Sequence, residues 1–154
     1  MPNSPFTQTQ HQALLQAARS AQDRAYAPYS RYQVGAAVLD EQGRIHAGCN
    51  VENAAYPEGL CAEAAALAAM VLAGGRRALA VLVVGNGGKN SSNWTTPCGG
   101  CRQKLREFGA PDLPVLCANA DSVGPHYTLA QLLPESFGPD HLNAHEALDP
   151  TPTP

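Results

Sequence analysis

The sequence predicts one α/β domain built as a three-layer α/β/α arrangement on a mixed sheet. Apolar stretches of strand length alternate with stretches of helical periodicity after an initial helix and hairpin, a pattern typical of layered α/β domains. At 154 residues the chain can bury a core without disulfide bonds, and a second catalytic domain would not fit. The pattern does not fix the order of the strands.

The first part of the chain predicts a helix followed by a hairpin. Apolar residues recur at helical spacing in residues 8–25, which indicates an amphipathic helix. Residues 32–39 and 44–49 are apolar and β-prone, and the turn-forming residues 40–43 separate them. We therefore expect two antiparallel strands after the helix.

The second part alternates helices and strands. Residues 61–72 are rich in Ala, Leu and Met and predict a buried helix, whereas residues 78–84 form a continuous apolar run typical of an interior strand. Residues 98–108 predict a third helix that ends at a glycine, and residues 113–118 predict another strand. A short helical turn is expected at residues 128–133.

Charge and terminal composition restrict the partners. The formal net charge is −3 and no Lys/Arg stripe is long enough to follow a phosphate backbone, so we expect no nucleic acid polymer as a partner. The N-terminal residues lack the basic and apolar regions of a signal peptide, and no apolar run approaches the roughly 20 residues of a membrane span. We expect a cytoplasmic protein with no membrane contact.

Five cysteines form an odd set in a chain without a secretory signal: Cys49, Cys61, Cys98, Cys101 and Cys117. In this context metal binding or catalysis outranks a disulfide framework. Cys49 and Cys117 lie in apolar strand patterns and are expected to be small core residues. The other three are the candidates for chemistry.

The candidate ligands stand at two predicted helix starts. Cys98 and Cys101 open one helix with a spacing that puts both sulfurs on one side of its first turn, where N–H groups and the helix dipole stabilise thiolates. This pair alone fits thiol redox chemistry and metal binding equally well. Cys61, at the start of another helix, supplies a third thiolate, so the three can hold one Zn²⁺ with a fourth position for water. A structural zinc site or a redox module is the non-enzymatic alternative.

Glu63 is the candidate general acid and base. It follows Cys61 by two residues, a spacing that in a regular helix would turn the two side chains away from each other. Both can face the metal only if the helix begins between them. We predict this boundary, which would let Glu63 reach the zinc-bound water.

Five segments of the chain resemble one known family: 27–30 (APYS), 34–37 (VGAA), 48–54 (GCNVENA), 61–63 (CAE) and 97–103 (PCGGCRQ). They are similar to segments of the small three-cysteine cytidine deaminases, and the similarity covers roughly residues 8–137. The resemblance implies a cytidine deaminase-like α/β/α fold whose central mixed sheet has five strands.

The same resemblance implies an activity. It is the Zn²⁺-dependent hydrolysis of cytidine and deoxycytidine to uridine and deoxyuridine plus ammonia, a step of pyrimidine salvage. Glu63 would transfer protons to ring N3 and then to the departing amine. A related small molecule, such as a nucleoside antibiotic or an N4-modified pyrimidine, is the alternative substrate.

The resemblance also implies residues that bind the free pyrimidine nucleoside. Asn50 and Glu52 would hold the ribose hydroxyls, and Tyr32 and Ala62 would lie close to the nucleoside. Phe137 resembles a phenylalanine that stacks on the base, often in the site of a neighbouring subunit. We therefore expect a homotetramer whose sites are completed between subunits, with Tyr56 as a cross-subunit contact. Residues 1–137 would form the catalytic domain, and residues 138–154 a polar, Pro-rich tail.

The chain departs from the family at two places. The family usually has arginine directly after the catalytic glutamate, where this chain has Ala64. Three thiolates on one dication leave a negative charge, and we hypothesise that Arg102 compensates it. The Gly-rich loop at residues 85–94 is longer than usual and is a candidate flap over the substrate.

Overall fold

The computed structural model describes residues 7–86, 94–119 and 123–142, and in them the chain forms a five-stranded mixed sheet of order β2-β1-β3-β4-β5. Strands β3 and β4 are parallel, and the other neighbouring pairs are antiparallel. The predicted mixed five-stranded sheet is therefore confirmed. Its strands are β1 (Val34–Asp40), β2 (Ile45–Cys49), β3 (Ala78–Gly85), β4 (Pro114–Ala118) and β5 (Val123–Thr128).

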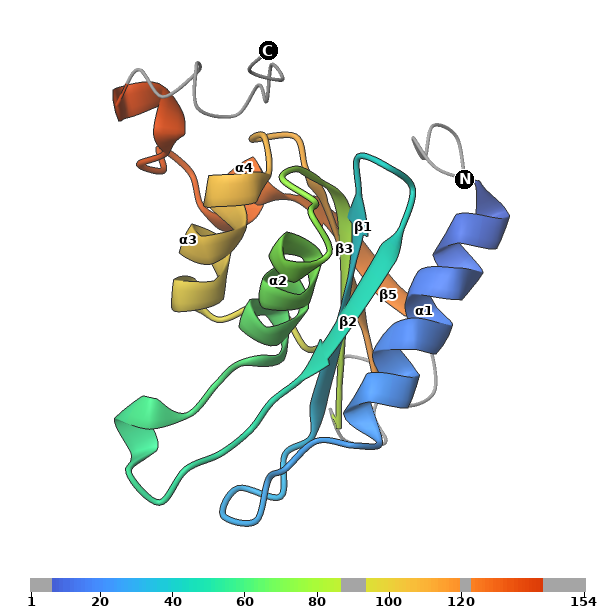
Figure 1. The fold of residues 1–154 in the computed structure, drawn as a ribbon, viewed down its shortest axis with the longest axis vertical. Helices are drawn as coiled ribbons and strands as arrows, with labels where there is room; N and C mark the ends of the chain where they lie inside the picture. Colours follow the sequence, from blue (N-terminus) through green and yellow to red (C-terminus); the bar gives the residue numbers. More distant parts are fainter. Residues whose placement is uncertain (1–6, 87–93, 120–122, 143–154) are drawn as a thin grey trace.

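Helices cover both faces of this sheet (Figure 1). Helix α1 (Gln8–Gln22) lies on one face, and α2 (Ala62–Leu72) and α3 (Gly99–Phe108) lie side by side on the other. The predicted α/β/α layering is confirmed. Three short turns complete the described part of the chain: η1 (Tyr56–Glu58), α4 (Leu129–Leu132) and η2 (Pro139–Leu142).

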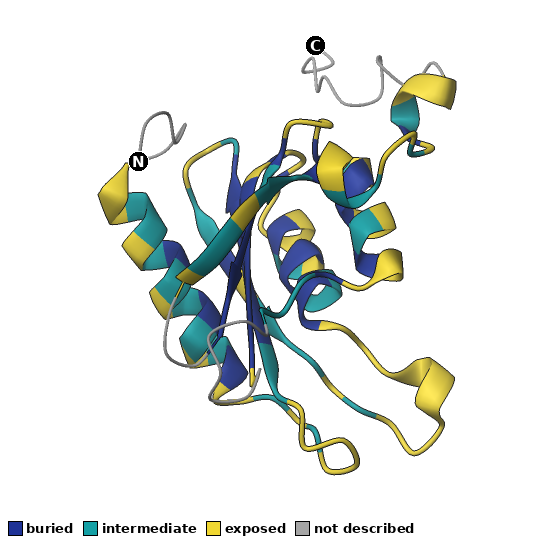
Figure 2. Cartoon of the chain, turned by 180° about the vertical axis from the view of Figure 1, so that it is seen from behind, coloured by how far each residue is buried: buried dark blue, intermediate teal, exposed yellow. Residues whose placement is uncertain are grey.

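The two cores follow from the period of two in the central strands. In β1, Ala37 and Leu39 pack toward α1, whereas Ala36 and Val38 pack toward α2. Strand β3 alternates in the same way and is buried almost throughout, as its continuous apolar sequence predicts. Figure 2 shows the buried residues concentrated in the central strands and on the inner sides of the helices.

Two glycines let helices approach the sheet closely. A Cβ on Gly35 of β1 would collide with the carbonyl oxygen of Ala18 in α1. A Cβ on Gly48 of β2 would collide with the backbone nitrogen of Ala66 in α2. The contact at Gly48 fixes α2 against the end of β2, and therefore fixes the position of the α2 N-terminus relative to the sheet.

The β1–β2 hairpin is held by a buried carboxylate. Burial opposes ionisation of Asp40, but hydrogen bonds from His46 and Arg44 outweigh it and lower the pKa of Asp40 to about 2. Arg44 also donates to the carbonyl oxygen of Ala73, at the C-terminal end of α2, over 2.8 Å. The hairpin and α2 are thus joined at the end remote from the cysteines.

The differences from the predicted elements lie at edges and ends. Strand β5 was implied by the family resemblance without a location; it lies at the edge of the sheet and is mostly half-buried. Helix α1 ends at Gln22 rather than at residue 25. Most of the predicted flap, residues 87–93, and residues 143–154 of the predicted tail lie outside the described residues. Among the described helices, none combines the length and the apolar character needed to cross a bilayer.

Candidate active site

The N-terminal ends of α2 and α3 carry the three candidate ligands. Cys61 is the N-cap of α2, with φ −78° and ψ 151°, and Cys98 is the N-cap of α3, with φ −65° and ψ 165°. Cys101 lies in the first turn of α3 and is buried, while the other two cysteines are exposed. Both cap residues have extended backbones, so their side chains stand outside the helical turns that follow.

The spacing of the thiols fits zinc. The three Sγ atoms lie within 4.8 Å of one another, and those of Cys61 and Cys98 are 3.9 Å apart. A tetrahedral zinc ion about 2.3 Å from each sulfur requires sulfurs about 3.8 Å apart. In the described part of the chain this is the one cluster of three or more His, Cys, Asp or Glu side chains.

The thiols differ in their readiness to ionise. Burial raises the pKa of Cys101 and of Cys61. For Cys98 burial acts in the same direction, but the backbone N–H of Cys101 and the neighbouring thiols outweigh it and lower its pKa. Three negative charges this close repel one another, so a cation is needed for all three to be thiolates.

Glu63 stands beside this cluster in the first turn of α2. Its side chain is only 4% exposed, and the thiol of Cys101 donates a hydrogen bond to its Oε2 over 3.3 Å. Because α2 begins at Ala62, the predicted boundary between Cys61 and Glu63 is confirmed. Burial raises the pKa of Glu63, and this brings a carboxyl group closer to the range useful for proton transfer at neutral pH.

Asn50 and Glu52 organise the segment before β1. Asn50 accepts a hydrogen bond from the Val34 N–H over 2.8 Å and donates one to the Tyr32 carbonyl over 2.9 Å. The Glu52 carboxylate accepts from the N–H of Tyr29 over 2.8 Å, and from the N–H and hydroxyl of Ser30. The Ser30 hydroxyl lowers the pKa of Glu52. These two side chains therefore hold the segment at residues 29–34.

A pocket opens next to Glu52. Its volume is about 340 Å³, and two tyrosine rings whose centroids are 5.8 Å apart form part of its wall. The lining residues are Tyr29, Ser30, Glu52, Asn53, Tyr56 and Gly59.

Tyr32 and Ala62 lie next to the two segments that carry the cysteines. The Tyr32 hydroxyl shares a 2.6 Å hydrogen bond with the hydroxyl of Thr95, three residues before Cys98. Thr95 packs so closely on Gly85 that a Cβ there would collide with it. Ala62 is fully buried as the first residue of α2. Tyr32 thus helps to fix the segment that leads into the metal cluster.

Phe137 lies apart from this group within the chain. Its side chain is 57% exposed and stacks on His141, with ring centroids 5.0 Å apart. Its carbonyl accepts a hydrogen bond from Gln103 of α3 over 3.0 Å. The η2 turn that follows lies at the opposite end of the molecule from the arm at residues 50–61 (Figure 1).

Arg102 connects the cysteine segment to α4. It donates to the carbonyl oxygen of Pro97 over 2.8 Å and to that of Leu132 over 2.7 Å. Burial raises the pKa of Cys117 to about 11, and the charge of Arg102 acts in the opposite direction. Cys117 is fully buried in β4, which confirms its prediction as a core residue, whereas Cys49 is half-buried at the end of β2.

Comparison with known proteins identifies the family. Residues 8–117 match the family model described as the cytidine and deoxycytidylate deaminase zinc-binding region. The chain belongs to the cytidine deaminase family. This confirms the zinc cofactor and the hydrolytic enzyme class predicted from the motifs.

Individual members of the cytidine deaminase family align over most of their length. Cytidine deaminase from Mycobacterium tuberculosis H37Rv is 45% identical over 118 residues, covering 77% of this chain and 82% of the relative. Cytidine deaminase from Sporosarcina psychrophila is 38% identical over 130 residues, covering 84% of this chain and 93% of the relative. The crystal structure of the Burkholderia pseudomallei cytidine deaminase matches with a TM-score of 0.75 at 41% identity, covering 82% of this chain and 98% of that chain.

Proposed function

We propose that this member of the cytidine deaminase family removes the exocyclic amino group of cytidine and deoxycytidine by hydrolysis and serves pyrimidine salvage. The observation that carries the proposal is a buried carboxyl group, Glu63, beside a cluster of three thiols. Of the described residues, only Cys61, Cys98 and Cys101 belong to that cluster, which leaves a fourth position for water. An open site of this kind is what a hydrolytic zinc enzyme needs.

In this proposal the three cysteines hold the zinc ion from two helix starts. When bound, zinc supplies a Lewis acid that makes water a competent nucleophile at neutral pH. The chain's own contribution is to present thiolates, and the caps at Cys61 and Cys98 do so from two helices whose N–H groups favour negative charge.

Glu63 moves the protons. Water adds to C4 of the pyrimidine, and Glu63 accepts a proton from it and donates a proton to ring N3. A second proton follows the same route to the amino nitrogen, the C4–N bond breaks, and ammonia leaves. Because burial raises its pKa, Glu63 can hold a proton between these steps at neutral pH better than an exposed glutamate can.

The proposed substrate contacts are Asn50, Glu52, Tyr32, Ala62 and Phe137. Asn50 and Glu52 already form hydrogen bonds with backbone groups of residues 29–34. In this proposal their remaining hydrogen-bond donors and acceptors bind the ribose hydroxyls. The link between Tyr32 and Thr95 supports a place for Tyr32 beside the cysteines. Phe137 is exposed, which supports its use in a neighbouring subunit's site.

A substrate panel on purified, zinc-loaded protein tests the proposal. We expect loss of the cytidine and deoxycytidine absorbance with release of one ammonia per nucleoside, and far slower reaction of free cytosine, which lacks the ribose. A nucleoside antibiotic and N4-methylcytidine belong in the same panel. Good turnover of one of these with no reaction of cytidine would overturn the substrate assignment.

We also propose that the protein is a homotetramer. Figure 1 shows residues 50–61 projecting from the sheet as an arm. The arm carries Tyr56, which is 76% exposed, and exposed Val51 and Leu60. Apolar side chains gathered in this way favour a protein partner. Sedimentation analysis is expected to give four chains for the native protein and smaller species for Tyr56→Asp. A native protein that sediments as a monomer would contradict the tetramer.

We place this activity in one catalytic domain, residues 1–137, with residues 138–154 as a tail. The start of the tail is attached, because Arg106 of α3 forms an ion pair with Asp140 of η2. Five cysteines without a disulfide bond suit a reducing compartment, which supports a cytoplasmic enzyme. The net charge of −3 suits a small nucleoside better than a nucleic acid polymer.

A further inference from the structure

The metal cluster has an unbalanced charge. Three thiolates and one Zn²⁺ sum to a single negative charge, and the position directly after Glu63 is occupied by the uncharged Ala64. Ala64 lies on a groove of about 330 Å³ between α2 and α3. The groove is lined by Ala64, Leu67, Ala68, Val71, Lys104, Glu107 and Phe108, so the space beside Ala64 is bordered by a lysine of the facing helix.

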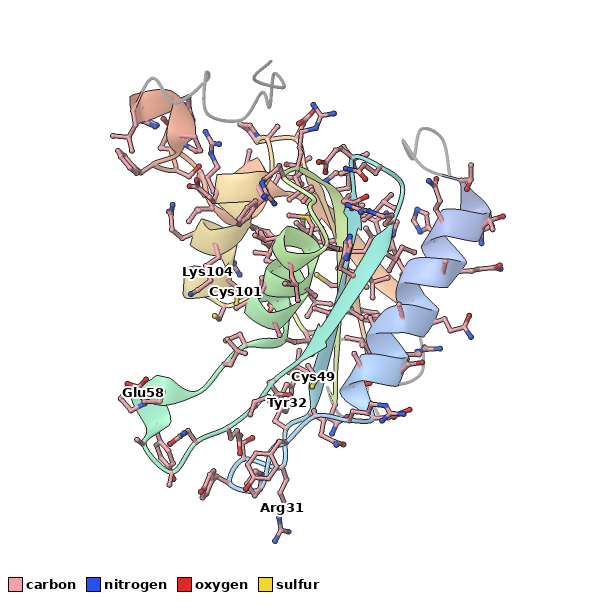
Figure 3. All side chains as sticks on the ribbon, in the orientation of Figure 1. Arg31, Tyr32, Cys49, Glu58, Cys101 and Lys104 are labelled. Atoms are coloured by element: carbon pink, nitrogen blue, oxygen red, sulfur yellow. The ribbon has the colours of Figure 1, made fainter. Side chains whose placement is uncertain are left out.

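Lys104 folds back over the first turn of α3, beside Gly100. It follows Cys101 by three residues on α3, so the two side chains lie on neighbouring turns of one helix face. Its Nζ is 3.7 Å from the position that a Cβ on Gly100 would occupy, in the first turn between Cys98 and Cys101. Figure 3 shows Lys104 and Cys101 close together on α3.

We propose that Lys104 supplies the positive charge that stabilises the three-thiolate zinc centre, acting from α3 across the space left by Ala64. The inference rests on the proposed zinc site. The Lys104 ammonium lies over the first turn of α3, the turn that carries Cys101, and a positive charge near a partly exposed anionic cluster lowers the free energy of that cluster even when water screens it.

Arg102 and Lys104 differ in whether other groups form hydrogen bonds with their charged ends. Arg102 is bound by the carbonyl oxygens of Pro97 and Leu132, so its guanidinium is fixed as a link between the cysteine segment and α4. Lys104 is exposed and shares the groove with Glu107, but in the described part of the chain no side chain forms a hydrogen bond or an ion pair with its ammonium. Its charge is therefore available to the thiolates.

Competition with a zinc chelator tests the inference without relying on activity. Lys104→Met is expected to weaken zinc binding by about three- to tenfold, the modest effect of one screened charge, and Lys104→Arg is expected to restore it. Ala64→Arg combined with Lys104→Met is also expected to restore binding, because it returns the charge from the facing helix. Arg77→Met is the control; it removes an exposed positive charge just before β3, beyond the C-terminal end of α2, and should leave zinc affinity unchanged.

The results separate this inference from the proposed function. If the native protein binds zinc and Lys104→Met binds it equally well, the role of Lys104 is wrong while the zinc site stands. An equal loss in Arg77→Met would also overturn it, because net charge alone would then explain the effect. If the native protein does not bind zinc, the proposed function itself fails. Thermal unfolding of each variant with its zinc removed should match the native protein, which confirms that the substitutions act on the metal.

Discussion

Glu63→Gln is expected to lower kcat for cytidine by about two to four orders of magnitude while zinc remains bound. Glutamine keeps the size of the side chain, and beside a zinc-bound Cys101 thiolate its amide nitrogen can donate a hydrogen bond. It cannot accept a proton from water and pass it to the pyrimidine. The loss should therefore appear in turnover, and the zinc content measured by mass spectrometry should stay near one ion per chain.

The comparison for Glu63→Gln is Asp112→Asn, which neutralises an exposed carboxylate in the turn before β4. This variant should match the native enzyme in kcat and in KM. Circular dichroism should show the same helix content for both variants. Turnover of Glu63→Gln near the native value would remove Glu63 from the mechanism.

Cys101→Ser is expected to weaken zinc binding by about a thousandfold or more and to abolish deamination together with it. Cys101 is the buried member of the cluster, and a serine hydroxyl is not ionised at neutral pH and is a poor zinc ligand. Two thiolates would then hold the ion. Dialysis against a chelator followed by metal analysis should give a protein with almost no zinc.

Cys49→Ser is the matched control for Cys101→Ser, because Cys49 is a half-buried cysteine at the end of β2 outside the cluster. It should keep its zinc and its activity. A Cys101→Ser protein that retains one zinc ion per chain would show that the three-thiol site is not the site of metal binding.

The sequence predicts the core of this fold better than its edges. Strand β3 was predicted from a continuous apolar run, because its two faces contact α1 on one side and α2 on the other. Strand β5 has no such pattern: it contains Gly124 and Pro125, and among the described strands it pairs with β4 alone. Proline is acceptable in an edge strand, where one row of backbone groups has no partner strand. Its place in the sheet depends on tertiary pairing that local sequence does not encode.

The candidate site shows the same division. The spacing of Cys61, Cys98 and Cys101 at predicted helix starts was enough to predict a shared cluster, since helix termini are among the clearer local signals. The hydrogen bonds of Asn50 and Glu52 to residues 29–34 could not be read from the sequence, because they join segments separated by 16 to 23 positions. Lys104 was missed for a different reason. The sequence shows a lysine three positions after Cys101. Its role in balancing the charge of the cluster can be inferred only from the structure, which places Ala64 on the same groove.

The start of α2 between Cys61 and Glu63 limits how this part of the chain can change. Inserting one residue within the first turn would rotate every later side chain by about 100° around the helix axis, so the acid would face another direction than its neighbouring sulfur. Deleting Ala62 would have the opposite rotation and the same outcome. The arm before α2 can become longer or shorter without changing the direction of the Glu63 side chain. The spacing between Cys61 and Glu63, by contrast, must stay at two residues.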